Sequence, residues 1–347
     1  MPQLRIRDFP INLGKFPTGE HNSITDVQGV TVGHSTIDTA DTHTGVTVVM
    51  PGKDNPFLNK YTAASFVQNG FGKTCGLMQL EELGTLETPI ALTNTLNVGK
   101  VSDALIAYII KQCEADGEEA LSINPIVGEC NDSRINRIQK RAVEAQHVEA
   151  AIGNCSTMVE QGAIGAGRGT VCFGFKGGIG TASRKIIIAD VEYTIGILVQ
   201  TNYGATADFV VDGQPIGERW LENHCGGSES DQGSIMVVLA TDLPVNSRQL
   251  KRILRRAGIG IMRTGAYIGH GSGEVMIGFT TKNRKFLLQE PITCEYILKD
   301  NLLNDAFLGA AEAVYEAILN SLVAAEPMKG LKGEEYTNLG DVLASYL

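Results

Sequence analysis

The chain has little of what marks a membrane-spanning, nucleic-acid-binding or secreted protein. Its 347 residues contain no run of about 18 uninterrupted apolar residues, which a membrane-spanning helix needs. Acidic residues outnumber basic ones by 39 to 29, and the net charge of −10 argues against a general nucleic-acid-binding face. The amino terminus lacks the apolar core of a signal peptide. These absences predict a soluble, cytoplasmic protein.

Residues that hold metals or cofactors do not form the required patterns. The seven cysteines include no Cys-x-x-Cys pair and favour reduced thiols over a zinc site or a disulfide framework. No further ligand clusters with His34 and His43. Phe71-Gly-Lys-Thr74 fails as a phosphate loop because Val67 stands where the first glycine belongs. Gly165-Ala-Gly167 lacks the third glycine of a dinucleotide fingerprint. We expect no cofactor and no metal.

The common hydrolase motifs are also missing. The chain contains no Gly-x-Ser-x-Gly elbow, no His-Glu-x-x-His pair and no Ser-x-x-Lys frame. A hydrolytic nucleophile would therefore need another means of activation. The length would allow two domains, but no Pro/Ser-rich linker or charge block divides the chain. We expect a single domain over residues 1–347.

Strand and helix patterns alternate along the chain, and its forty glycines are clustered rather than periodic, which suggests tight turns. Two short strands are expected to flank a polar loop that holds His34 and His43. Asp132 or Ser133 is expected to cap a helix through residues 135–148, and Ser247 to cap another. The polar stretch 205–232 predicts an irregular, flexible loop. Further segments are expected as strands at 89–94, 124–129 and 274–281, and as helices at 98–113 and 306–325.

One junction between a turn and a strand is of chemical interest. A polar turn ends at Gly233, and the β-type run Ser234-Ile-Met-Val-Val-Leu-Ala-Thr-Asp242 begins at the next residue. A serine at the first position of a buried strand is held rigidly, and a glycine before it can adopt strained backbone angles. Cleavage before Ser234 would place a hydroxyl and an amine on one residue. From spacing alone, an ordinary Gly-Ser turn remains the alternative.

The segment from Gly233 to Asp242 resembles the cleavage segment of the DmpA family of serine aminopeptidases, which includes the β-peptidyl aminopeptidases. Other blocks resemble the family in the same order along nearly the whole chain. They are His43-Thr-Gly-Val-Thr, Leu92-Thr-Asn-Thr-Leu-Asn-Val-Gly99, Val127-Gly-Glu-Cys-Asn-Asp132, Gly162-Ala-Ile-Gly-Ala-Gly167, Cys172-Phe-Gly-Phe-Lys-Gly-Gly-Ile-Gly-Thr-Ala-Ser-Arg184, Val199-Gln-Thr-Asn-Tyr-Gly204 and Gly271-Ser-Gly-Glu274.

The resemblance implies an α+β fold, a four-layer αββα sandwich similar to that of amino-terminal-nucleophile hydrolases. It also implies self-cleavage between Gly233 and Ser234 into an α chain, residues 1–233, and a β chain, residues 234–347. Four such αβ pairs would form the assembly. The expected activity is the release of amino-terminal residues from short peptides, amides or esters.

The resemblance further implies roles for five residues. Ser234 would be the nucleophile, with Ser272 and Glu274 orienting its hydroxyl and amine. Asn202 would donate a hydrogen bond to the oxyanion, and Glu129 would bind the amino group of the substrate. A second oxyanion donor, a tyrosine in some relatives, has no counterpart in Cys130-Asn-Asp-Ser-Arg134.

Two other functions are compatible with parts of these patterns. Ornithine acetyltransferases resemble this family in architecture but use a threonine nucleophile, so acyl transfer is one alternative; the serine favours hydrolysis. The other is a glycine-rich binding protein without catalytic activity.

Overall fold

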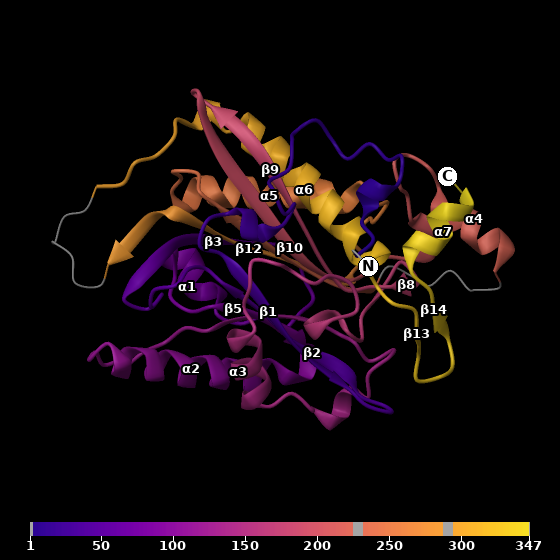
Figure 1. Ribbon diagram of the computed structural model, residues 1–347, viewed down its shortest axis with the longest axis horizontal. Coiled ribbons are helices and arrows are strands. Elements are labelled where there is room, and N and C mark those ends of the chain that lie inside the picture. Colours follow the sequence, from indigo (N-terminus) through magenta and orange to yellow (C-terminus); the bar gives the residue numbers. More distant parts are fainter. Residues whose placement is uncertain (1–2, 225–231, 287–293, 347) are drawn as a thin grey trace.

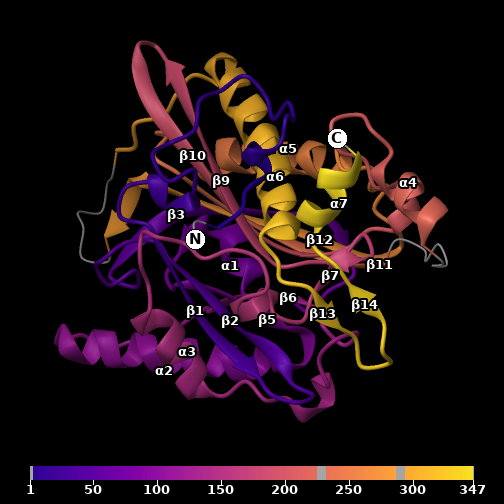
Figure 2. The same cartoon turned by 45° about the vertical axis from the view of Figure 1, so that its right-hand side comes forward.

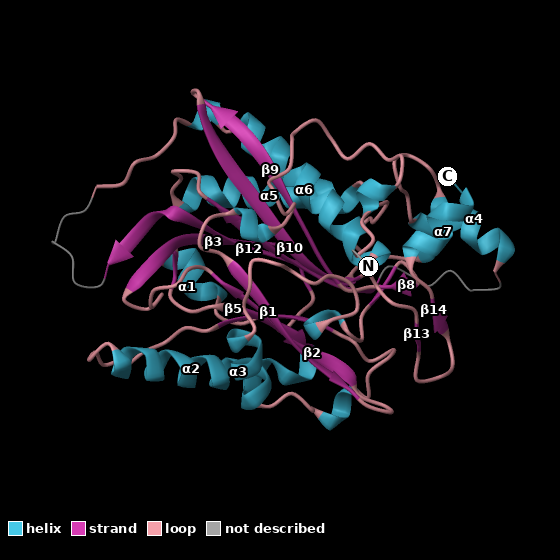
Figure 3. Cartoon of the chain, in the orientation of Figure 1, coloured by secondary structure: helices cyan, strands magenta, loops and turns pink. Residues whose placement is uncertain are grey.

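A computed structural model describes residues 3–224, 232–286 and 294–346. Two β-sheets pack face to face, and helices cover the outer face of each (Figures 1 and 3). Sheet and helix layers therefore follow the order αββα, as predicted. The part of the expected flexible loop at 225–231 lies outside the described residues.

The smaller sheet has four strands in the order β1-β2-β5-β6. These strands are β1 Thr31–Asp38, β2 His43–Met50, β5 Ile90–Asn94 and β6 Ile126–Cys130. Only the last pair is parallel. The helix α2 (Val98–Ala115) connects β5 to β6 and covers the outer face together with α3 (Ala145–Gly153). The predicted helix at 98–113 is confirmed, and its residues Val101, Leu105 and Ile109 are fully buried.

The larger sheet has six strands in the order β4-β3-β12-β11-β10-β9. They are β3 Asn59–Gly70, β4 Thr85–Leu86, β9 Ile179–Ile188, β10 Val191–Asn202, β11 Gln232–Thr241 and β12 Gly271–Phe286. The helix α5 (Ser247–Met262) links the parallel pair β11 and β12. Figure 2 shows α6 (Asn304–Val323) lying over β9 and β10. Apart from Gln232 and Gly233 at the start of β11, the two central strands thus follow residue 233, whereas the strands on both sides of them precede it.

Alternate side chains of β11 point into two different apolar cores. Ile235 and Val237 belong to the core under α5 and α6, whereas Met236 and Val238 belong to the core between the sheets. A third apolar cluster fills the space under α2 and α3. Because side chains alternate along a strand, Ser234 lies on the face that points toward the smaller sheet. This position brings its hydroxyl toward β6.

The remaining elements are short. They are α1 Leu77–Glu82, β7 Val171–Cys172, β8 Phe175–Lys176, α4 Ile216–Asn223, β13 Met328–Lys329, β14 Glu335–Tyr336 and α7 Leu339–Tyr346. Residues 216–223 were expected to be irregular, and that prediction was wrong. The amphipathic helix α4 buries Ile216 and packs near α7.

The helix α6 is long and apolar enough to cross a membrane, but 89% of that window is buried in the protein. Two carboxylates in its interior, Glu312 and Glu316, are buried as well. The fully buried guanidinium of Arg184 pairs with Glu312 at 3.2 Å and with Glu316 at 2.7 Å. The half-exposed Arg7 binds Glu316 from the other side at 2.6 Å. Here α6 is a core helix of the sandwich.

The predicted helix through residues 135–148 was wrong up to residue 144. Only a 3₁₀ turn forms at Ile138–Lys140, and α3 begins at Ala145. The Asp132 side chain is buried, and its Oδ1 accepts from Asn136 Nδ2 at 2.9 Å. It therefore supports a turn, and Arg141 then takes a left-handed conformation, with φ 48°, that a helix cannot contain.

Two local predictions also need correction. His34 and His43 lie within β1 and β2, whose pairing extends to Asp38 and His43, so no loop separates the histidines from the strands. The cap of α5 is Asn246, whose side chain accepts from the backbone nitrogen of Gln249, while Ser247 is the first helical residue. An asparagine suits the cap as well as a serine does.

Candidate active site

Ser234 lies near the start of β11, between strands of opposite direction. It is paired with Asn202, the last residue of β10, and with Gly273 of β12. Its side chain is buried, and the Cβ of an alanine at position 273 would lie 3.0 Å from its Oγ. The glycine of β12 therefore leaves the space that the hydroxyl occupies.

The peptide bond before Ser234 has an unusual conformation. Gly233 has a φ of +131°, a value that side-chain-bearing residues rarely adopt. The Ser234 hydroxyl donates to the Gly233 carbonyl oxygen at 2.7 Å. The hydroxyl and the bond that self-cleavage would break are therefore adjacent.

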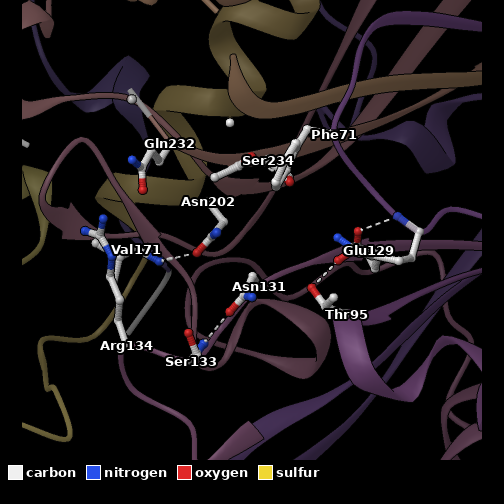
Figure 4. Close-up of a pocket in the computed structure, with 14 residues that line it drawn as sticks. Phe71, Thr95, Glu129, Asn131, Ser133, Arg134, Val171, Asn202, Gln232 and Ser234 are labelled. Carbon is white, nitrogen blue, oxygen red and sulfur yellow. Dashed lines mark hydrogen bonds between the residues drawn. The ribbon is translucent and has the colours of Figure 1, made fainter. Parts of the chain in front are cut away.

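A cavity of about 240 Å³ opens beside this bond. Gly233, Ser234, Asn202 and Glu129 all line it, so three of the five predicted site residues and the predicted cleavage position meet there. They come from β10 and β11 of the larger sheet and from β6 of the smaller sheet. Figure 4 shows Ser234 and Asn202 next to each other, with Glu129 on one side of them.

The orientation of Asn202 is fixed by the hairpin of β7 and β8. The backbone nitrogen of Val171 donates to Asn202 Oδ1 at 3.0 Å (Figure 4). The Nδ2 group is the remaining end of this amide, and it is a hydrogen-bond donor. Asn202 therefore has the chemistry of an oxyanion donor at the position paired with Ser234.

A buried lysine holds that hairpin in place. The Nζ of Lys176 donates to the carbonyl oxygens of Gly167, Thr170 and Gly177 at 3.0, 2.8 and 2.6 Å. Burial lowers the pKa of the Lys176 ammonium well below its usual range. These three hydrogen bonds join the glycine-rich segment before Val171 to the β8 end of the hairpin after it. Val171 lies between these two anchored segments.

The Glu129 carboxylate is held by two donors. The backbone nitrogen of Lys73 donates to Oε1 at 2.8 Å, and the Thr95 hydroxyl donates to Oε2. Glu129 as a whole is only 3% exposed, and it lines the cavity wall. A Cβ at Gly72 would lie 3.2 Å from Oε1, so the glycine lets this loop approach closely. A fixed carboxylate in a small cavity suits a substrate ammonium group.

Ser272 and Glu274 lie on β12 but on the other side of the sheet. They flank Gly273, pair with Gly233 and Ile235, and are fully buried. The Ser272 hydroxyl donates to Glu274 Oε1. Because side chains alternate, this pair points toward the α5 and α6 layer and away from the Ser234 hydroxyl. Neither residue lines the cavity; both lie beside the backbone of residues 233–235.

Other lining residues were not predicted from the sequence. Lys73 belongs to the segment that fails as a phosphate loop, and Thr95 lies in a family-like block without an assigned role. Asn131 and Arg134 occupy the region where a second oxyanion donor was in doubt. Asn131 Oδ1 accepts from the Ser133 nitrogen at 3.0 Å. The family-like blocks at 92–99 and 127–132 were the signal that could have drawn attention to Thr95 and Asn131.

Within the described ranges, no three His, Cys, Asp or Glu side chains gather in a metal-binding arrangement. His34 Nδ1 lies 2.9 Å from Thr47 Oγ1, and His43 contacts Asp38. Each histidine thus has a partner from the paired strand.

Comparison with known families matches residues 22–336 to a family described as Peptidase family S58. The chain belongs to peptidase family S58. The predicted resemblance is confirmed, and so is the predicted class of fold. A curated relative is the β-peptidyl aminopeptidase BapA of Sphingosinicella xenopeptidilytica, which is 36% identical over 94% of this chain and 86% of its own.

Solved structures agree with this assignment to family S58. A protein from Pyrococcus horikoshii OT3 superposes with a TM-score of 0.93 at 40% identity, and the match covers 98% of each chain. The L-aminopeptidase D-Ala-esterase/amidase of Ochrobactrum anthropi gives a TM-score of 0.89 at 33% identity over 99% of this chain and 98% of its own. It is described as a prototype for the serine aminopeptidases and a new variant of the Ntn hydrolase fold.

Proposed function

We propose that this chain is an aminopeptidase that cleaves itself before Ser234 and then uses Ser234 as its nucleophile. The observation that carries the proposal is the pairing of Ser234 with Asn202 at a cavity whose facing wall holds Glu129. Nucleophile, oxyanion donor and amine-binding carboxylate thus have separate places in one small site. The aminopeptidase names of the relatives support the same reaction.

Self-cleavage starts when the Ser234 hydroxyl adds to the carbonyl carbon of Gly233. The bond between that carbon and the Ser234 nitrogen breaks, and the hydroxyl proton ends on the departing nitrogen. Water then hydrolyses the resulting ester, which leaves a carboxylate on residue 233 and a free amine on Ser234. The left-handed Gly233 and the 2.7 Å contact between hydroxyl and carbonyl favour this step.

The freed amine supplies the base that the precursor lacks. An α-amine has a reference pKa of about 7.7–8.0, so it accepts the hydroxyl proton near neutral pH. Ser234 Oγ adds to the substrate carbonyl, and Asn202 donates to the oxyanion that forms. The amine then returns the proton to the leaving group, and water releases the acyl group by the same steps in reverse. Before cleavage the nitrogen is an amide, so the precursor is inactive.

Glu129 restricts the reaction to substrates with a free amino group. Its two oxygens are already oriented by Lys73 and Thr95, so an ammonium group meets a fixed negative charge. Glu274, next to the backbone of residues 233–235, stabilises the positive charge on the Ser234 amine, and Ser272 holds the Glu274 carboxylate.

Assembly and location form part of the proposal. The family resemblance supports an assembly of four αβ pairs. The six cysteines within the described ranges are free thiols, which suits a cytoplasmic protein. Size-exclusion chromatography coupled to light scattering measures the first property directly, and cell fractionation measures the second.

Intact-mass analysis of the purified protein tests the proposal. Two fragments are expected, residues 1–233 and 234–347, and the smaller one begins with Ser234. Ser234→Ala prevents self-cleavage and abolishes hydrolysis of amino-acyl p-nitroanilides. The wild-type enzyme is expected not to hydrolyse analogues whose amino group is acetylated. Full activity in an uncleaved chain would refute the mechanism. Efficient acetyl transfer to ornithine without p-nitroanilide hydrolysis would replace it by the acyltransferase alternative.

A further inference from the structure

The active-site cavity carries opposite charges on its two sides. Glu129 lies on one side of Ser234 and Asn202, and Arg134 lies on the other (Figure 4). All four residues line the same cavity of about 240 Å³. Because Ser234 and Asn202 occupy the middle, the two charges face opposite ends of a bound substrate.

The backbone of Arg134 is fixed although its side chain is exposed. Its carbonyl oxygen accepts from the backbone nitrogen of Leu331 at 2.9 Å, in the connection between β13 and β14. The next residue, Ile135, is fully buried in a cluster with Val171 and Tyr336. The guanidinium is therefore presented to the cavity from an anchored turn, and Val171 of the same cluster also orients Asn202.

The chemistry of the proposed reaction sets the direction of the substrate. With its ammonium group at Glu129 and its scissile carbonyl at Ser234 and Asn202, the leaving group extends toward Arg134. The first group of fixed charge on the leaving side of a dipeptide is its terminal carboxylate. A guanidinium matches a carboxylate with two parallel hydrogen bonds, and its five donors allow more than one partner at a time.

We propose that Arg134 binds the terminal carboxylate of the leaving residue, so the preferred substrates are dipeptides with a free carboxyl group. This inference rests on the proposed aminopeptidase function and adds its substrate class. Lys73, another cation at the cavity, enters through the loop that holds Glu129, and its Nζ lies 5.1 Å from the Phe71 ring centre. It therefore belongs to the amine side and does not take this role.

A neighbouring cavity explains why dipeptides are preferred to longer peptides. Arg134 and Gly204 also border a space of about 790 Å³, whose lining includes Glu334 and Glu335. A longer leaving group would extend past Arg134 into this space. Its terminal carboxylate would then lie past the Arg134 guanidinium and approach Glu334, an unfavourable neighbour, whereas Glu335 is paired with Lys329 at 3.3 Å. A dipeptide ends before this point.

The test compares substrates that share one amino-acyl residue, X, chosen as the fastest in a p-nitroanilide panel. The substrates are X-Ala, its amide X-Ala-NH2, the tripeptide X-Ala-Ala and X-p-nitroanilide. In the wild type, kcat/KM for X-Ala exceeds that for X-Ala-NH2 and X-Ala-Ala by about 10- to 100-fold, as expected for loss of a charged hydrogen bond. Equal rates for the acid and the amide would overturn the inference without any variant.

Variants then assign the effect to Arg134. Arg134→Gln raises KM for X-Ala by about 10- to 100-fold and brings the kcat/KM values for X-Ala and X-Ala-NH2 within about twofold of each other, and Arg134→Lys gives an intermediate KM. Arg137→Gln is the matched control, because Arg137 lies outside the cavity lining and pairs with Asp41. If Lys73→Gln lost the preference for X-Ala over X-Ala-NH2 and Arg134→Gln kept it, the assignment to Arg134 would be refuted. In every case p-nitroanilide hydrolysis reports separately whether the proposed function holds.

Discussion

A Cβ atom on Gly233 would lie 1.9 Å from the carbonyl oxygen of Asn202 in the neighbouring strand. Gly233 also has a φ of +131°. Gly233→Ala must therefore shift the strand edge that carries the scissile bond. We expect this variant to remain a single full-length chain and to show no aminopeptidase activity.

Gly99→Ala is a suitable control for that change, since a Cβ at Gly99 meets nothing within 4 Å. This control should process completely on a denaturing gel. Normal cleavage of Gly233→Ala would show that the backbone conformation at this position is not required.

Asn202→Asp separates the two ends of one side chain. The carboxylate still accepts from the Val171 nitrogen, which donates at 3.0 Å, but it no longer donates to an oxyanion. Loss of one oxyanion donor lowers kcat by about 100- to 1,000-fold in comparable sites. We expect slow self-cleavage and a kcat reduced by that order. A kcat near the wild-type value would remove Asn202 from the reaction.

Glu129→Gln keeps the shape of the amine-binding wall and removes its charge. The amide oxygen can still accept from the Lys73 nitrogen. Without the charged hydrogen bond, kcat/KM for amino-acyl p-nitroanilides should fall by about 10- to 100-fold. Self-cleavage needs no free amine, so it should proceed at its normal rate. Equal losses in both reactions would indicate a structural role instead.

Arg184→Met tests the buried charge cluster under α6. The change leaves Glu312 and Glu316 buried with their principal counter-charge removed. Breaking a buried ion pair costs about 3–5 kcal/mol in free energy of unfolding. Urea denaturation in a Ser234→Ala background, where the chain stays continuous, measures this cost.

Arg248→Met is the matched surface change for that experiment. Arg248 pairs with Asp300 at 2.8 Å, but both side chains are largely exposed. Its loss should cost less than about 1 kcal/mol. Similar losses of stability in the two variants would contradict the view that burial makes the Arg184 cluster important.

Asp132 should make stability depend on pH. Burial raises the pKa of its carboxyl to about 6 from an ordinary value of 3.8. Between these values the folded chain keeps a proton that the unfolded chain loses, so stability is highest below about pH 4 and falls as pH rises through about 6. His34, whose pKa is lowered to about 4, acts in the opposite direction over the same range.

Comparison with Asp132→Asn isolates the Asp132 contribution, because His34 is common to both proteins. The asparagine keeps an acceptor for Asn136. Relative to the parent, the variant should gain about 3 kcal/mol in free energy of unfolding between pH 4 and pH 7. Parallel pH profiles of the two proteins, recorded in the Ser234→Ala background, would disprove this effect.

Local pattern predicted much of this molecule, and pairing between distant strands supplied the rest. The strand from Ser234 and the helix from Val98 followed from their apolar periodicity. The meeting of Ser234, Asn202 and Glu129 did not, because it depends on the register of β10 with β11 and on how two sheets face each other. Only the family resemblance named these residues before the structure brought them together.

The same limit explains the positions of Ser272 and Glu274. Their spacing places both on one face of a strand, but that face is defined only by the alignment of β12 with β11. At Asp132 the local signal was misleading instead. A residue that suits a helix cap is buried in a turn, because its hydrogen bonds with Thr44 and Asn94, which are distant in the sequence, outweigh the local preference.

The strand order of the larger sheet implies that unfolding after the proposed cleavage would be irreversible. The two strands that would belong to the β chain lie in its centre, with strands of the α chain on both sides. The strands of the two chains alternate in one sheet, so cleavage would leave the folded molecule intact. It would remove the covalent link that brought the two chains together during folding. Such an enzyme would fold only as the continuous precursor. After denaturation of the mature form, the two separate chains would have to find each other before they could refold.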